Sequence, residues 1–231
     1  MYDCQCDDCL PPSVPPMGGN LSNGLHFHAH SDLAAGDKLF KEVLNAAKSA
    51  LKHLFAMGSY SPEDLNQKEY KKLIDETYKA FERAIADNDI PDRMRQALES
   101  DAFLFGGLKA HAQLSEAFSM IKDGQIKSWS EIEHEFDKLN DTYNRNWLQA
   151  EYNFAVNASQ QAANWANTDP DGRYNLQYRT ALDEKVREEH AALEGITLPK
   201  EDEFWSKFYP PNGWNCRCTA VEVRKSKYAE S

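Results

Sequence analysis

The chain has 231 residues, which is enough for one large or two small domains. Hydrophobic residues make up 41% of it and aromatic residues 11%, so the chain can fill a core and is not a disordered protein. Its 26 basic and 37 acidic residues give a net charge of −11, which excludes a general nucleic-acid binder because phosphate contacts need clustered lysine and arginine. No apolar run reaches the length of a membrane span and no secretion signal opens the chain, so we expect a soluble protein without membrane contacts, made in a cytoplasm.

Residues 1–36 are predicted to form a flexible arm rich in cysteine, histidine and proline. The arm holds three of the five cysteines and three histidines at alternate positions: Cys4, Cys6, Cys9, His26, His28 and His30. An odd number of cysteines in two tight clusters argues against a secreted disulfide scaffold and favours metal ligands or free thiols. Two interpretations of the arm stay open: a zinc site, and an unstructured segment whose cysteines do nothing in isolation.

Residues 37–167 are predicted to be helical. Apolar residues recur at helical spacing in residues 38–57. Ser61 and the proline after it then begin a second helix, because serine is a good capping residue and proline is tolerated in the first turn. Further along, the pair Gly106-Gly107 is predicted to break a helix, since glycine has a low helix propensity.

A long amphipathic helix is predicted at the end of this region. Ser128 and Ser130 are its candidate capping residues. Its apolar stripe extends from Ile132 to Trp165, which indicates a helix of roughly 35 residues and about 50 Å. Such a helix is either a core helix of a bundle or a stalk that reaches between partners. We favour the bundle.

The character of the sequence changes near residue 168. Residues 174–180 alternate in polarity and are typical of a strand, and residues 219–223 alternate in the same way and predict a final short strand. The segment 183–193 between them is predicted to be helical or turn-like. The expected fold class is therefore α+β: a long-helix N-terminal bundle followed by a small compact α+β C-terminal domain, residues 168–231.

The most informative segment is residues 209–219. Two prolines and a glycine make it a loop of fixed shape that presents Cys216 and Cys218 in one geometry. Zinc needs four ligands in a tetrahedron, and a Cys-x-Cys pair supplies two. His190 and Asp183 are further candidate ligands, because seven residues along a helix place them on one face. In the alternative interpretation, both cysteines are small packing residues beside the final strand.

The same region allows a catalytic interpretation. A cysteine and a histidine with an acid can form a nucleophile site, although no sequence feature here indicates a lowered thiol pKa. The charged residues Arg179, Arg187 and Asp183 equally predict a buried ion-pair network that holds a small domain together.

Several separated motifs resemble the phage Mu F-like minor head proteins, also called head-morphogenesis proteins. One motif is Asn-Leu-Gln-Tyr-Arg-Thr-Ala-x-Asp at residues 175–183, and another is Tyr-Pro-Pro-Asn-Gly-Trp-Asn-Cys-Arg-Cys at residues 209–218. The residues that carry the resemblance are Tyr178, Arg179, Asp183, Arg187, His190, Pro210, Pro211, Trp214, Cys216, Arg217 and Cys218. The resemblance covers about residues 150–223 and identifies residues 168–231 as a Mu F-like C-terminal domain.

The resemblance implies a non-enzymatic virion component, present in few copies inside the head near the portal and made in the host cytoplasm. The implied partners are the portal protein and the major capsid or scaffold protein of the procapsid, while contact with DNA is left open. The alternative is a small enzyme or toxin, nuclease or ADP-ribosyl-transfer-like, that uses a face formed by Arg179, Asp183 and His190.

The resemblance also bears on the expected zinc. Many members of the family carry a cysteine pair where this chain has Arg187 and His190. This departure argues against a site of four thiolates. It leaves His190, Cys216 and Cys218, with one further ligand, as a candidate zinc site beside the packing interpretation.

Overall fold

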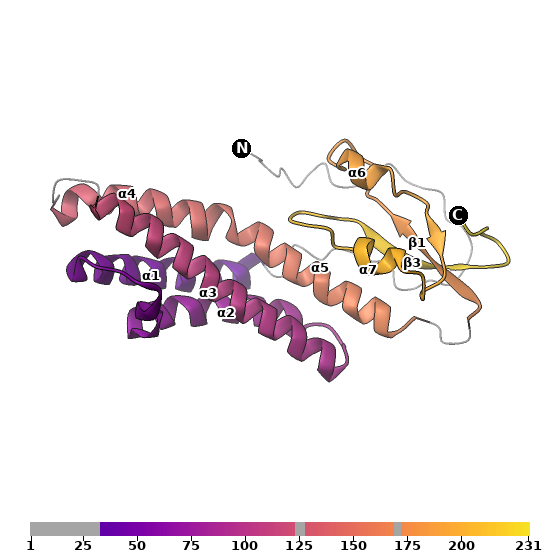
Figure 1. The fold of residues 1–231 in the computed structure, drawn as a ribbon, viewed down its shortest axis with the longest axis horizontal. Coiled ribbons are helices and arrows are strands. Elements are labelled where there is room, and N and C mark those ends of the chain that lie inside the picture. Colours follow the sequence, from indigo (N-terminus) through magenta and orange to yellow (C-terminus); the bar gives the residue numbers. More distant parts are fainter. Residues whose placement is uncertain (1–32, 123–127, 169–171) are drawn as a thin grey trace.

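The computed structural model describes residues 33–122, 128–168 and 172–231. Cys4, Cys6 and Cys9, and with them the interpretations of the N-terminal arm, lie outside these residues. The described chain has a helical part and a small part built on a three-stranded sheet (Figure 1). The predicted α+β class, with its helices first, is confirmed.

Five long helices make up the helical part: α1 Leu33–Met57, α2 Lys68–Ala86, α3 Asp92–Lys122, α4 Trp129–Asp141 and α5 Leu148–Ala166. A 3₁₀ turn, Pro62–Asn66, precedes α2. Ser61 caps this turn and not α2 itself, which begins at Lys68. The backbone N–H of Ser61 donates to Asp64 Oδ2 at 2.7 Å, while Asp64 N donates to the Ser61 carbonyl at 3.0 Å. Among the described residues, every helix is too short or too polar to cross a membrane.

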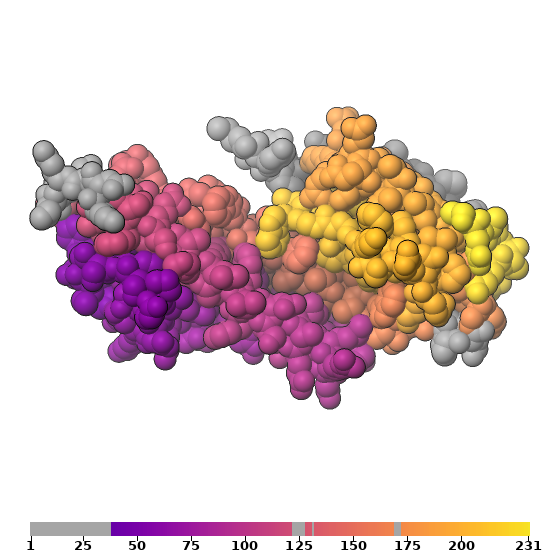
Figure 2. All heavy atoms as spheres, in the orientation of Figure 1, coloured from indigo at the N-terminus to yellow at the C-terminus, as the bar shows by residue number. Residues whose placement is uncertain are grey.

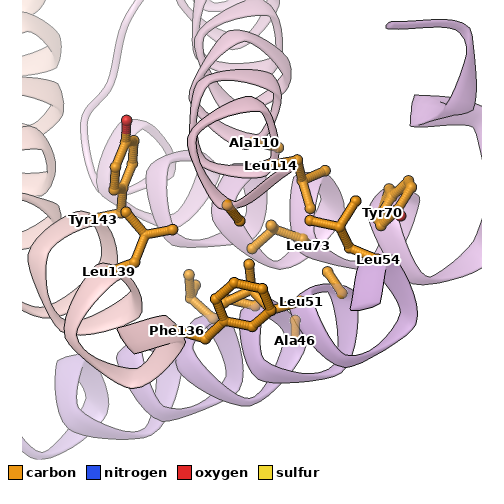
Figure 3. Packing of buried hydrophobic residues seen from close by; sticks show 14 of the residues in the cluster. Ala46, Leu51, Leu54, Tyr70, Leu73, Ala110, Leu114, Phe136, Leu139 and Tyr143 are labelled. Carbon is orange, nitrogen blue, oxygen red and sulfur yellow. The ribbon is translucent and has the colours of Figure 1, made fainter. Parts of the chain in front are cut away.

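The helices of this part share one hydrophobic core. Leucines of α1, α2 and α3 interdigitate there with Phe136 of α4 (Figure 3). Leu51, Leu54, Leu73 and Leu114 are buried in it almost completely. Since burying one such side chain contributes about 1.5–3 kcal/mol, this cluster is the main source of stability for the bundle.

Helix α3 passes through Gly106-Gly107 without a break, so the predicted interruption is wrong. Glycine costs a helix about 1 kcal/mol relative to alanine, and packing on both sides of the pair outweighs this cost. Ala110 and Leu114 are buried in the core. A Cβ placed on Gly106 would lie 3.5 Å from the Ile74 carbonyl oxygen, which shows how closely α3 approaches α2 there.

The long helix predicted after Ser128 is present, but it is interrupted. A π-helical turn, Thr142–Asn146, separates α4 from α5. Ile132, Phe136 and Leu148 of these helices are buried, so the bundle interpretation is confirmed over the stalk.

The C-terminal part is an antiparallel sheet in the order β2-β1-β3 with two short helices. Its elements are β1 Tyr174–Arg179, α6 Glu188–Ala191, β2 Thr197–Leu198, α7 Phe204–Phe208 and β3 Thr219–Arg224. Both strands predicted from alternation are confirmed as β1 and β3. The segment expected to place Asp183 and His190 on one helix face does not do so, because α6 begins only at Glu188.

A second core lies between this sheet and α5. Its buried members are Leu176, Tyr178, Trp205, Cys216, Cys218 and Ala220. Trp165 of α5 packs against them, so α5 contributes to both cores and joins the two parts (Figure 1).

Candidate functional site

The loop between α7 and β3 carries the two cysteines and has a fixed course. The Pro210–Pro211 peptide bond is cis, and Gly213 and Asn215 both adopt positive φ, at 92° and 58°. Glycine and asparagine are the residues that adopt this conformation most readily, so the sequence suits the turn. The backbone leaves this turn at Cys216 and enters β3 at Thr219.

Cys216 and Cys218 meet His190 of α6 in the C-terminal core. The His190 Nδ1 atom lies 3.8 Å from Cys216 Sγ and 3.5 Å from Cys218 Sγ. All three residues are buried: Cys216 is 3% exposed, Cys218 6% and His190 7%. Neither cysteine forms a disulfide. The structure therefore brings together three of the four expected zinc ligands.

Arg187 fixes this cluster from its outer side. Its Nη1 donates to the Asn212 carbonyl at 3.1 Å, its Nη2 donates to the Trp214 carbonyl, and Nη1 also lies 3.2 Å from His190 Nε2. A guanidinium group only donates, so Nε2 must accept from it. In a neutral imidazole the proton then sits on Nδ1 and faces the two sulfurs.

The electrostatics of the cluster favour one thiolate. A hydrogen bond from the Cys218 thiol, together with backbone hydrogen bonds from Asn212 and Cys218, lowers the pKa of Cys216 to about 5. The same hydrogen bond, together with burial, raises the pKa of Cys218 above its ordinary value. Burial, followed by the hydrogen bond to Cys218, raises the pKa of the fully buried Tyr178 as well. The directions of the two shifts favour a thiolate on Cys216, with the Cys218 thiol as its hydrogen-bond donor.

The donor set matches zinc in one respect and conflicts with it in another. Tetrahedral zinc separates a sulfur from a nitrogen ligand by about 3.6 Å, as calculated from ordinary bond lengths, and the two observed separations bracket this value. However, a histidine that binds metal through Nδ1 carries its proton on Nε2 and donates it to an acceptor. Here Nε2 of His190 faces the donor Arg187. Zinc therefore fits the three donor atoms but not the position of this arginine.

Asp183, the fourth expected ligand, is placed elsewhere. Both of its carboxylate oxygens accept from Arg217, each at 2.6 Å, which lowers the pKa of the carboxyl. Arg179 is separate again, since its Nε donates to Gln177 at 2.9 Å. The three charged residues expected to form one network therefore take different partners.

Two residues of α5 that the sequence analysis did not single out hold the loop in place. Asn157 Nδ2 donates to the Cys216 carbonyl at 2.9 Å. Gln161 accepts from the Tyr209 hydroxyl at 2.9 Å with its carbonyl, and from Ala220 N at 3.3 Å with its side chain. The sequence held one sign of this role: Asn157 and Gln161 carry amide side chains one helical turn apart, on a helix with hardly any charged residues.

The comparisons with known proteins concern this same region. Residues 116–221 match the family model described as "Phage Mu protein F like protein", from the last two turns of α3 to the middle of β3. Residues 116–221 are thus similar to the Mu F-like proteins. The resemblance drawn from the motifs is confirmed, and the match begins well before the quoted motifs, inside the helical part. No match to a solved structure was found.

Two Mu F-like relatives are similar to parts of the chain. The protein of Escherichia phage Mu named "Putative capsid assembly protein F" is 50% identical over 54 residues, which are 23% of this chain and 12% of that protein. The "Mu-like prophage FluMu F protein" of Haemophilus influenzae is 34% identical over 73 residues, 32% of this chain and 17% of the relative. The similarity thus spans less than a fifth of either relative.

Proposed function

We propose that this protein is a structural minor head protein of a tailed phage or prophage, which acts in head assembly by docking on the portal and procapsid. The match of residues 116–221 to the Mu F-like family carries this proposal. The name of the phage Mu relative, a capsid assembly protein, supports it. In this proposal the protein works inside the head near the portal, and its partners are the portal and the major capsid or scaffold protein.

The geometry of the cysteine cluster supports a structural role over a catalytic one. A nucleophile must reach its substrate, whereas Cys216, Cys218 and His190 are buried under the loop that carries them. Their contacts instead join three separate segments: α6, the loop and β1, which contributes Tyr178. The cluster is thus a polar anchor that fixes the shape of the loop.

The enzyme alternative required Arg179, Asp183 and His190 on one face. In the structure these residues contact Gln177, Arg217 and the cysteine cluster respectively. This arrangement offers no shared site for a substrate, and it favours the structural proposal.

Co-expression of the full chain with the portal protein of the same phage tests the proposal. Size-exclusion chromatography should show the two proteins eluting together, and the major capsid protein in place of the portal serves as a comparison. A folded chain that elutes apart from the portal would contradict the proposed docking.

Zinc binding at His190, Cys216 and Cys218 stays a prediction. The separations of the donor atoms support it, and the contact of Arg187 with Nε2 opposes it. Metal analysis of the purified full chain decides the matter. The site would be supported by one zinc ion per chain that is lost when Cys216 and Cys218 are both replaced by serine. A folded chain that contains no zinc would rule the site out.

A further inference from the structure

The helices α3 and α5 carry very little charge where they meet the C-terminal part. Charged residues make up 27% of the chain, yet residues 102–115 and 146–166 contain only Lys109 and Glu151. These two are buried, and they pair with each other across the two helices. The exposed side chains of both segments are therefore uncharged.

Large apolar side chains gather on this uncharged surface. Leu104 and Leu108, one helical turn apart on α3, are 60% and 59% exposed. Trp147, just before α5, and Trp214, in the cysteine loop, are 48% and 46% exposed. We call these four residues the junction patch.

Ring contacts place Trp214 at the seam between α3 and α5. Leu104 directly precedes Phe105 on α3, and Leu108 lies one helical turn after it. The Trp214 ring packs against Phe105 of α3 and Phe154 of α5, with ring centroids 5.5 and 4.9 Å apart. Trp147 lies one turn before Glu151, which pairs with Lys109, the residue next to Leu108. In the space-filling view, the loop that carries Trp214 reaches from the C-terminal part over this seam (Figure 2).

Trp214 is held in place within the patch. Arg187 donates to the Trp214 carbonyl, and the rings of Phe105 and Phe154 contact the Trp214 side chain. An uncharged surface with exposed tryptophan is typical of the centre of a protein interface, where charged residues are depleted and aromatic residues enriched.

Four exposed acids lie close in the chain to residues that line or support the patch, and the exposed Arg145, two residues before Trp147, pairs with Asp141. Asp101 lies one turn before Phe105, and Glu116 lies two turns after Leu108 on the same helix. Glu188 and Glu189 follow Arg187 at the start of α6, and all four acids are exposed. Such acids repel DNA phosphates and, in a chain of net charge −11, a second copy of the same face.

We infer that the junction patch is the surface that docks on the portal, and that the portal presents there an apolar centre ringed by lysine or arginine. This inference rests on the proposed function, because it takes the portal as the partner. Beyond the proposed function, it specifies which face of this chain contacts the portal and which residue types the portal presents to that face.

Single glutamates in the patch test this inference. Leu104→Glu and Leu108→Glu change exposed positions, so the fold should tolerate them, and each places a charge in the centre of the interface. Binding of the full chain to the purified portal should weaken at least tenfold. Met57→Glu is the matched control, since Met57 is 52% exposed at the end of α1 and outside the patch, and it should change binding less than twofold.

The outcomes separate the inference from the proposed function. If the unchanged chain does not bind the portal, both fall. If it binds and the two patch variants bind equally well, or Met57→Glu weakens binding as much as they do, only the assignment of the face falls. If the patch variants instead reduce the mass of the protein alone in light scattering and leave portal binding intact, the face joins two copies of this chain and the inference is wrong.

Discussion

Cys216 links the charge of the buried cluster to stability. Its pKa is lowered to about 5 in the folded chain, well below the ordinary value of a thiol in an unfolded chain. Between these two values the unfolded chain binds a proton on Cys216 that the folded chain does not. The free energy of unfolding therefore gains a contribution that is present in full above the unfolded pKa and is lost as pH falls through about 5.

Urea unfolding at several values between pH 5 and pH 8 checks this expectation. The stability difference between the natural chain and Cys216→Ser should shrink toward pH 5. Thiolate absorbance at 240 nm should show one ionised thiol at neutral pH that titrates near pH 5. A thiolate signal that arises only above pH 8 would contradict the assignment.

The partners of each site residue explain why the sequence predicted the cluster only in part. Cys216 and Cys218 are two apart, so both side chains leave the same side of an extended segment, and this could be predicted. His190 joins them through the fold. Asp183 does not share a helix face with His190, because α6 begins only at Glu188. The side chain of Arg217, between the two cysteines, leaves the opposite side of the segment and binds the Asp183 carboxylate.

At the scale of the element, α3 makes a direct test possible. A Cβ on Gly107 meets nothing within 4 Å, and the residue is helical. Gly107→Ala should therefore stabilise the protein by about 0.5–1 kcal/mol through helix propensity. Thermal or urea unfolding measures the change.

Gly58 supplies the contrasting control for this measurement. It has a φ of +65° after the end of α1, so Gly58→Ala should destabilise the protein by about 1 kcal/mol. If Gly107→Ala also destabilises, α3 is broken at the glycine pair as the sequence suggested.

Elements with a clear period were predictable, and those set by packing were not. The alternation of β1 and β3 spans six residues each, whereas the two residues of β2 are too few to show a period. The π-helical turn at Thr142–Asn146 lies within a continuous apolar stripe, which gives no local sign of it. The continuity of α3 through its glycine pair depends on packing against α2, and helix propensities of single residues carry no information about such packing.

The Lys109–Glu151 pair joins α3 to α5 inside the molecule. Burial lowers the pKa of Lys109 and raises that of Glu151, while each partner opposes the shift of the other. Lys109→Ala leaves a buried carboxylate unpaired and should cost about 3–5 kcal/mol of stability. The double variant Lys109→Met with Glu151→Leu should be more stable than Lys109→Ala in urea unfolding, because it leaves no buried charge unpaired. A double variant less stable than Lys109→Ala would contradict this and show that the ion pair is a net source of stability.

At the scale of the whole molecule, α5 makes the two parts depend on each other. Ser159 of α5 donates to the Ile85 carbonyl of α2 at 3.1 Å. Two residues further along, Gln161 bonds the cysteine loop and β3, and Trp165 packs on Tyr209 with ring centroids 4.9 Å apart. One helix therefore supplies a wall to both cores. For this reason we expect the parts on either side of residue 168 to fold together.

A comparison of two fragments tests this dependence. The fragment 168–231 lacks Asn157, Gln161 and Trp165, so its second core is open on one side. Its loop loses two hydrogen bonds and β3 loses one. It should lack the near-ultraviolet circular dichroism of packed tryptophans, whereas the fragment 33–231 should keep it and unfold in one transition. If 168–231 folds alone with dispersed amide signals in nuclear magnetic resonance, α5 is only a neighbour of the second core. Since small domains bury too little apolar surface to lose a wall of their core, we expect a cooperative single unit.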